Sequence, residues 1–225
     1  MCGRFVLFST LDMILVSFKL KGSYDIVPRY NIAPTQNVSG VVLSAEAGGP
    51  VLKPFKWGLV PHWAKDPSMG VRMINARADS VAEKPAFRGA FRSRRCLIPA
   101  DGFVEWRQDR SKKLPMLIRM KDRHLFAFAG LYEQWKAPDG STLDSCTIIT
   151  CEPNPLVTKF HTRMPVILYP ESYDQWIDPA TPTSAGLASL LVPYDENQME
   201  AVRISQKINS AKNEGPECIE EVTRD

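Results

Sequence analysis

The sequence predicts an α+β protein whose sheets are mainly antiparallel and curl into a barrel-like core with short flanking helices. Two observations favour this class: short apolar segments follow one another closely, and turn residues rather than long helices separate them. A chain of 225 residues with 44% hydrophobic content can bury one sizeable core. We therefore expect a single domain over residues 1–225, and the pattern disfavours a doubly wound parallel sheet.

The first expected element is a helix in the segment STLDMILVSF, residues 9–18. Ser9 and Asp12 have the spacing of a capping motif. Apolar residues then recur at helical intervals from Leu11 to Phe18. This helix should pack one face on the core.

Residues 38–44 and 51–60 predict a hairpin, because the turn-forming stretch AEAGGP separates two apolar runs. Pro54 has no N–H to donate, which moves its strand toward a sheet edge. Further segments have the composition of strands: residues 95–100, 102–106, 114–120, 125–133, 146–151, 164–169 and 201–206. Short helices are expected near residues 81–92, 153–160 and 171–177.

The beginning of the chain resembles neither a membrane span nor a secretion signal. Arg4, Asp12 and Lys19 interrupt the first twenty residues, so no run of roughly 18 apolar residues forms there. The five cysteines, at positions 2, 96, 146, 151 and 218, follow no disulfide framework. We expect a reducing compartment: the cytoplasm of a bacterium, near the nucleoid at sites of damage, or the nucleus of a eukaryote.

Charge is distributed unevenly along the chain, although the formal net charge is only +3. Residues 51–100 contain ten Lys or Arg and three Asp or Glu, whereas residues 151–200 contain two and seven. The run RGAFRSRR, residues 88–95, is typical of a surface that meets phosphates. A solvated helix face that leads into a strand is an equally good interpretation.

The sequence contains no motif typical of a metal site or of a nucleotide-cofactor site. Cys146 and Cys151 lie five residues apart on one expected strand, so their side chains point to opposite faces. The histidines, at positions 62, 124 and 161, form no metal-ligand spacing, and no glycine-rich phosphate loop is present. We expect no metal and no cofactor.

The chain begins MCGRF, and removal of Met1, which the small side chain of Cys2 favours, would leave Cys2 with a free amine beside its thiol. Such a pair captures aldehydes: the amine forms an imine, and the thiol closes onto the imine carbon. Closure within one residue benefits from effective molarities of roughly 10⁵ M or more. An α-amine with a pKa of about 8 is partly neutral at physiological pH. Taken alone, Cys2 is more simply a chance residue.

Seven segments, in order over nearly the whole chain, resemble the SRAP (SOS response-associated peptidase) family: MCGRF, RYNIAPTQ (29–36), WGLVPHW (57–63), INARADS (74–80), CLIPADGFVEW (96–106), FHTRMPVIL (160–168) and INSAKNEG (208–215). The resemblance implies a protein that binds single-stranded DNA and forms a covalent thiazolidine with abasic sites, shielding the lesion during a DNA damage response. Asp79 departs from the pattern, in which we expect glutamate.

The resemblance implies Cys2 as the nucleophile, with Asn75, Glu105 and His161 as supporting residues. Apolar neighbours in GFVEW would raise the pKa of Glu105 toward neutrality and suit it to proton transfer; otherwise it is an exposed strand carboxylate. His161 would protonate the sugar ring oxygen, or serve as a structural hydrogen-bonding residue. Asn75 would orient the amine or a sugar oxygen, or only form a turn.

Contacts to DNA are expected from Arg4, Asn31, Pro34, Trp63, Arg77 and Arg163. Arg4 and Arg77 are candidates for phosphates, or for internal salt bridges. Trp63 is a candidate stacking platform with a buried core position as the alternative, whereas Trp57 is expected in the core.

Two other functions stay open. In the first, Cys2 is the nucleophile of a thiol peptidase, acting on Met1 or on other substrates, with His161 as base and Asn75 in the oxyanion hole. In the second, the protein is a noncatalytic binder of single-stranded DNA or modified bases. The imine route itself permits weak abasic lyase activity. The sequence indicates no protein partner, and a monomer is the default expectation.

Overall fold

Five strands form a closed barrel: β3 (Asn37–Ser44), β4 (Gly49–Trp57), β6 (Arg95–Ala100), β9 (Phe126–Lys136) and β10 (Thr142–Cys151). The computed structural model describes residues 2–182 and 185–222. Around the ring, β4 pairs with β3, β3 with β6, β6 with β9, β9 with β10, and β10 with β4. Only the β10–β4 pair of this ring is parallel. The barrel-like α+β core expected from the sequence is therefore confirmed.

Three short strands extend the barrel: β5 (Asn75–Arg77), β11 (Met164–Pro165) and β12 (Ile167–Leu168). β11 pairs with β10 and β12 with β9, so the single strand expected over residues 164–169 is two strands. Between them, the Val166 N–H donates to Ile149 O at 2.9 Å, and its carbonyl accepts from Ala129 N at 2.9 Å. Residues 164–168 thus fill the gap where β9 and β10 diverge.

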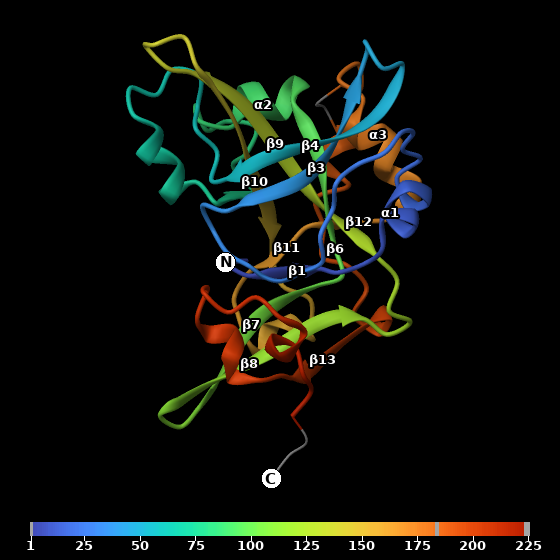
Figure 1. The fold of residues 1–225 in the computed structure, drawn as a ribbon, viewed down its shortest axis with the longest axis vertical. Coiled ribbons are helices and arrows are strands. Elements are labelled where there is room, and N and C mark those ends of the chain that lie inside the picture. The colour runs from blue at the N-terminus through green and yellow to red at the C-terminus, as the bar shows by residue number, and fades with distance from the viewer. Residues whose placement is uncertain (1, 183–184, 223–225) are drawn as a thin grey trace.

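A second, antiparallel sheet has the order β13 (Met199–Arg203), β8 (Lys112–Met120), β7 (Gly102–Asp109), β1 (Phe5–Leu7) and β2 (Arg29–Ile32). Figure 1 shows the barrel above and β7, β8 and β13 below, with β1 and the N-terminus between them. Phe5 pairs with Ile32 on one side and with Phe103 on the other. The start of the chain is therefore held at the junction of the two sheets.

The helices are short: α1 (Leu11–Ser17), α2 (Arg88–Ser93), α3 (Tyr173–Ile177) and α4 (Ala185–Ala188). The 3₁₀ segments are η1 (Pro67–Arg72), η2 (Val157–Lys159), η3 (Pro170–Ser172), η4 (Glu196–Gln198), η5 (Gln206–Asn209) and η6 (Pro216–Cys218). The helix expected over residues 81–92 begins only at Arg88, and the one over 153–160 is reduced to η2.

The cap of α1 differs from the expected one. Thr10, not Ser9, is the N-cap residue, and its hydroxyl accepts from Met13 N at 3.4 Å. Ser9 turns away and donates its hydroxyl to Asp101, which also accepts from Ser9 N at 2.8 Å. Asp101 lies between β6 and β7, so this contact ties the chain after β1 to the link between the sheets.

The core contains the ring of Phe5 edge-on to Trp57, with centroids 5.2 Å apart, and to Phe128 at 5.7 Å. Trp57 is fully buried, as expected. On one side of β4, Pro54 pairs with Ser39 of β3. On its other side, β4 pairs with β10 only at Lys56 and Trp57, so among the described residues no strand is paired with Pro54 there. The edge position expected for Pro54 is therefore confirmed.

Arg95, the last residue of the basic run, is not part of a phosphate-binding surface because it is only 2% exposed. Its guanidinium donates to main-chain carbonyls at the ends of α2 and α3, those of Phe91, Arg92, Trp176, Asp178 and Thr181. A cation at helix C-termini is favourable because the unpaired carbonyls carry partial negative charge. Arg95 is thus a structural residue, whereas Arg88 and Arg92 are exposed.

All five cysteines of the chain are free and buried. Within the described residues, no helix has both the length and the apolar character needed to cross a membrane.

Candidate functional site

Cys2 lies three residues before the start of β1 and close to Glu105 of β7. The two strands pair in antiparallel register through Phe5 and Phe103, which brings the residues before Phe5 alongside those after Phe103. Cys2 is fully buried. Burial raises the pKa of its thiol, and the negative charge of Glu105 raises it further. The thiol is therefore held protonated beside a carboxylate that can accept its proton.

Glu105 is a buried carboxylate, only 4% exposed. Burial raises its pKa from 4.5 to about 7. Phe103 and Val104, the preceding residues of β7, are fully buried, which explains the loss of solvation that the GFVEW segment predicts. The alternative of an exposed strand carboxylate is wrong. Near neutral pH, Glu105 exists in both protonation states and can act as acid and as base.

Glu105 and His161 line the same pocket, which has a volume of about 620 Å³. Its other lining residues, which the sequence analysis did not single out, are Trp106, Gln108, Lys113, Phe160 and Asn209. Trp106 adjoins Glu105 in GFVEW, and Asn209 lies in INSAKNEG, so both could have been found from the motifs. The indole of Trp106 donates to Asn209 Oδ1 at 2.7 Å, which ties β7 to η5.

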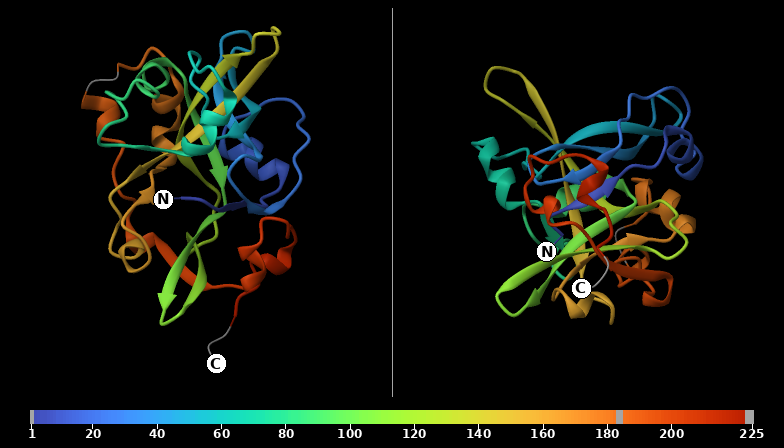
Figure 2. Two further views of the ribbon diagram at one scale, coloured as in Figure 1. Left: turned by 90° about the vertical axis from the view of Figure 1, so that its left-hand side faces the viewer. Right: turned by 60° about the horizontal axis from the view of Figure 1, so that its bottom comes forward.

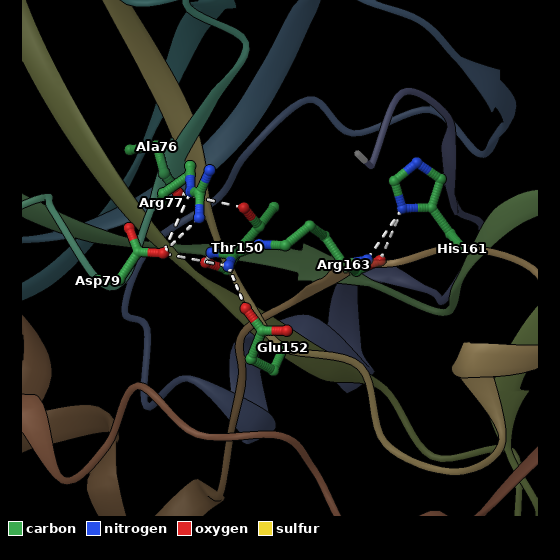
Figure 3. Close-up of polar contacts among 7 residues, drawn as sticks. All are labelled: Ala76, Arg77, Asp79, Thr150, Glu152, His161 and Arg163. Carbon is green, nitrogen blue, oxygen red and sulfur yellow. Dashed lines mark hydrogen bonds and ion pairs between the residues drawn. The ribbon is translucent and has the colours of Figure 1, made fainter.

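The imidazole of His161 is held by the backbone of Arg163: the Arg163 N–H donates to His161 Nδ1 at 3.0 Å (Figure 3). Burial lowers the pKa of His161 below its ordinary value of 6.5. The ring is therefore mainly neutral at neutral pH and serves as a hydrogen-bonding group.

Asn75 begins β5, where it pairs with Ile148 of β10. Its amide nitrogen donates to Ile74 O at 3.0 Å and to Ile148 O at 3.4 Å. Its Oδ1 is buried without a hydrogen-bond partner among the described residues. An unpaired buried acceptor costs roughly 1–3 kcal/mol, so this oxygen is suited to a donor group that a ligand supplies.

Arg77, Asp79, Glu152 and Arg163 form an ionic cluster at the edge of β5 and β10, shown in Figure 3. Arg77 donates to Asp79 Oδ2 from Nε at 3.1 Å and from Nη2 at 2.7 Å. Arg163 contacts Asp79 Oδ2 at 3.3 Å and Glu152 Oε1 at 2.6 Å, and donates to Thr150 O at 2.7 Å. The structure therefore brings Arg77 and Arg163 together around one carboxylate.

Asn31 and Arg4 form hydrogen bonds within the protein. Asn31 is fully buried, so the direct DNA contact expected for it is wrong for this structure. Its amide donates to Ser210 O at 2.8 Å and Asn213 O at 2.7 Å, and its Oδ1 accepts from Arg4. Arg4 also donates to Ile208 O at 2.7 Å. These contacts fasten the C-terminal strap, which we define as residues 205–218, to β1 and β2.

Trp63 is 49% exposed, which contradicts the alternative of a buried core position. It borders a pocket of about 780 Å³ that it forms with residues 64–66, 68, 69 and 71–73. Thr35, next to the half-buried Pro34, lines a neighbouring pocket of about 350 Å³ that shares Asp66, Ser68 and Val71 with it. Residues of η1 thus line both the pocket of Trp63 and the pocket of Thr35.

The loop that carries η1 is fixed by a contact between two glycines. Gly58 has a φ of +132°, and a Cβ there would lie 2.6 Å from Gly70 O. Only glycine accommodates both this backbone conformation and this approach.

Among the residues that the structure describes, no group of three or more His, Cys, Asp or Glu is arranged to hold a metal ion.

Comparison with known proteins gives consistent matches. A family model described as SOS response associated peptidase (SRAP) matches residues 1–211. The abasic site processing protein YoqW of Bacillus subtilis is 47% identical over an alignment of 226 positions that covers 98% of this chain and 99% of that protein. The abasic site processing protein HMCES of Xenopus tropicalis is 31% identical over 85% of this chain and 65% of its own length. A crystal structure of a protein from Bacteroides thetaiotaomicron superposes with a TM-score of 0.73 at 30% identity, over 87% of this chain and 82% of that one.

Proposed function

The chain belongs to the SOS response associated peptidase (SRAP) family, and from this premise we propose that it captures abasic sites in single-stranded DNA through Cys2. The relatives YoqW and HMCES are named abasic site processing proteins, which supports the substrate class. The observation that carries the mechanism is the buried Cys2 beside Glu105, whose pKa is raised to about 7. The protein would act in the response to DNA damage.

The first step is imine formation at the aldehyde of the ring-opened sugar. Once Met1 is removed, the α-amine of Cys2 attacks the aldehyde carbon and forms a carbinolamine. Protonated Glu105 donates a proton to the carbinolamine hydroxyl, which leaves as water, and a C=N bond forms. The amine is the first nucleophile because the raised pKa of the thiol disfavours a thiolate.

The second step is ring closure. The Cys2 sulfur forms a bond to the carbon of the protonated imine while its proton passes to the Glu105 carboxylate, and the electron pair of the C=N double bond returns to the nitrogen, which keeps its proton. The product is a five-membered thiazolidine. The two steps together release one water molecule and need no oxidant or reductant. A carboxyl group with a pKa of about 7 can give the first proton and take the second.

His161 and Asn75 would orient the sugar. The neutral imidazole of His161 would donate a hydrogen bond to the ring oxygen and favour the open aldehyde, because its lowered pKa leaves little imidazolium to act as a full acid. The buried Oδ1 of Asn75 would accept from the Cys2 amine or from a sugar hydroxyl. Both residues hold the aldehyde close to the amine.

Contacts to the strand would come from Arg77 and Arg163 at phosphates and from Trp63 at an unpaired base. Reversible binding should therefore weaken as the salt concentration rises.

The test is a denaturing gel with a single-stranded oligonucleotide in which uracil glycosylase has produced one abasic site. We expect a heat-stable shifted band with the wild type and none with Cys2→Ala. After loss of Met1, the alanine variant keeps a terminal amine, so its imine should undergo β-elimination and release a cleaved strand. Equal shifted bands with both proteins, or an intact mass showing that the purified protein retains Met1, would overturn the proposal.

A thiol peptidase acting on other proteins is less well supported. Such an enzyme needs a thiolate as its first nucleophile, whereas burial raises the pKa of the Cys2 thiol and disfavours the thiolate; capture of an aldehyde begins with the amine instead. Intact-mass measurement of Glu105→Gln and His161→Ala shows whether Met1 removal depends on these residues. Cleavage of unrelated peptides by the wild type would make the peptidase the primary function.

A further inference from the structure

Asp79 is the shared acceptor for two arginines. Its Oδ2 atom lies 3.1 Å from Nε and 2.7 Å from Nη2 of Arg77, and 3.3 Å from Nη1 of Arg163. Figure 3 shows dashed lines from the Asp79 carboxylate to both guanidinium groups. The hydrogen bond from Arg77 lowers the pKa of Asp79, so the carboxylate is charged at neutral pH.

The ionic cluster is open to solvent on the side of Arg77. The side chains of Arg77 and Asp79 are 65% and 47% exposed, whereas that of Arg163 is 11% exposed. Glu152, the second acid, is 73% exposed and contacts only Arg163 of the two arginines. Two positive charges are therefore balanced by two negative charges, and within this cluster Asp79 is the acid that contacts both guanidiniums.

A recess of about 270 Å³ adjoins this cluster and is lined in part by Asp79, Glu152 and Arg163. A phosphate that approaches Arg163 in this recess, or Arg77 on the exposed side of the cluster, meets a guanidinium whose hydrogen bonds already go to a carboxylate. The phosphate must displace that carboxylate or bind beside its negative charge. An arginine that keeps its internal carboxylate partner neutralises a phosphate less completely, so fewer cations are released from the DNA on binding.

We propose that Asp79 is a specificity-determining residue: as the internal counterion of Arg77 and Arg163, it weakens reversible binding of intact single strands. This inference rests on the proposed function, in which these arginines contact phosphates. Retention on DNA then depends on covalent capture by Cys2, so that only strands carrying an aldehyde are held. Undamaged single-stranded DNA, which offers phosphates but no aldehyde, is released.

The test compares Asp79→Asn with the wild type in binding an intact, fluorescently labelled single-stranded oligonucleotide, measured by anisotropy over a series of salt concentrations. The asparagine keeps an oxygen that accepts from Arg77 but removes the charge. We expect about threefold to tenfold tighter binding in low salt. The plot of log affinity against log salt should steepen by about 0.7 for each arginine that becomes available to a phosphate.

The variant should also lose discrimination: unlabelled intact strands should compete about threefold to tenfold better against crosslinking of an abasic strand. Asp79→Glu keeps the charge and should behave like the wild type. Glu46→Gln, at the exposed β3–β4 turn, changes net charge by the same amount and should leave affinity unchanged.

Unchanged or weaker binding by Asp79→Asn would overturn the inference, and so would an equal gain with Glu46→Gln. Arg77→Ala separates this failure from that of the proposed function. If Arg77→Ala weakens binding while Asp79→Asn does not strengthen it, only the role of Asp79 is wrong. If Arg77→Ala binds as tightly as the wild type, the phosphate contact in the proposed function is wrong as well.

Discussion

The backbone N–H of Arg163 donates to Nδ1 of His161 at 3.0 Å, and this contact determines the tautomer of the imidazole. The same nitrogen lies 3.2 Å from Arg163 O. Because the lone pair of Nδ1 accepts from the N–H, this nitrogen cannot also carry a proton to give to the carbonyl. The proton of the neutral ring therefore resides on Nε2, which is the donor that the proposed mechanism requires.

This tautomer can be measured by ¹⁵N nuclear magnetic resonance of His161. We expect Nε2 to have the shift of a protonated ring nitrogen and Nδ1 that of an unprotonated one at neutral pH. The titration should give a pKa below 6.5, since burial disfavours the cation. His124, an exposed histidine, supplies the comparison within the same spectrum. A proton on Nδ1, or a pKa above 6.5, would contradict this account of His161.

Glu105 should make crosslinking depend on pH. Imine formation needs protonated Glu105 and ring closure needs its carboxylate, and both forms are well populated only near pH 7. The rate of thiazolidine formation with excess protein should therefore pass through a maximum near neutral pH and fall on both sides. Glu105→Gln can neither give the first proton nor accept the thiol proton, and we expect a rate at least about 100-fold lower. A maximum near pH 7 that survives in Glu105→Gln would assign this titration to another group.

The burial that raises the pKa of Glu105 also lowers the free energy of unfolding once its carboxylate is ionised. Its folded pKa of about 7 exceeds the ordinary value of 4.5, so the unfolded state ionises first and stability falls as the pH rises from 4.5 to 7. Above pH 7 the full cost is about 3 kcal/mol. Glu105→Gln should thus stabilise the protein by about 3 kcal/mol at pH 8 and by about 1 kcal/mol at pH 5, measured by urea unfolding.

Glu133→Gln is the matched control for this measurement. Glu133 is also buried, at 6% exposure, and its carboxylate accepts from the guanidinium of Arg94 at 2.7 Å. Removal of this charge leaves a half-buried guanidinium without its partner and should destabilise the protein at pH 8. If Glu105→Gln also destabilised the protein at pH 8, the ionised carboxylate of Glu105 would add to the stability of the folded state rather than lower it.

Trp63 and Trp57 should separate DNA binding from folding. Trp63→Ala removes a half-exposed ring and should weaken single-strand binding by about 1–3 kcal/mol with little effect on thermal unfolding. Trp57 is fully buried and donates to Ile74 O at 2.9 Å, so Trp57→Phe should lower the melting temperature. Titration with an intact oligonucleotide measures the first effect. Unchanged affinity of Trp63→Ala would exclude stacking on this ring.

The barrel strands could be predicted because each contains a run of apolar residues and most are separated by turn residues. β1, β2 and β5 could not, since they have three or four residues and are extended because neighbouring strands pair with them, β7 with β1, β1 with β2 and β10 with β5. Residues 164–168 resemble one strand, but β9 and β10 diverge at this point and each takes half of the segment. The sequence of residues 164–168 does not indicate that β9 and β10 diverge there.

The raised pKa of Glu105 could be predicted from the sequence, whereas the burial of Arg95 and Asn31 could not. The apolar neighbours of Glu105 in GFVEW indicated its raised pKa, which requires only local sequence. Arg95 and the exposed Arg92 look alike in RGAFRSRR, and only the ends of α2 and α3 distinguish them. Asn31 is similarly buried by the C-terminal strap, which is distant in sequence.

Glu214 of the C-terminal strap covers the outer edge of β2. Its Oε1 accepts from Tyr30 N at 2.6 Å and from Asn31 N at 3.0 Å, and its Oε2 accepts from Arg29 Nε at 2.8 Å. A carboxylate that takes edge N–H groups replaces a neighbouring strand. Figure 2 shows this red segment beside the green strands of the second sheet. Glu214 lies beyond residue 211, where the family match ends.

We expect Glu214→Ala to lower the free energy of unfolding by about 1–2 kcal/mol, because two N–H groups lose a charged acceptor. Crosslinking should also slow, since Asn31 connects the strap to Arg4, two residues after Cys2. Glu214→Gln keeps an oxygen for the N–H groups and should restore most of both losses. Urea unfolding and single-turnover crosslinking, at a temperature where every variant is folded, measure the two effects separately. If Glu214→Ala loses stability but crosslinks at the wild-type rate, the strap supports the fold and has no part in positioning the start of the chain.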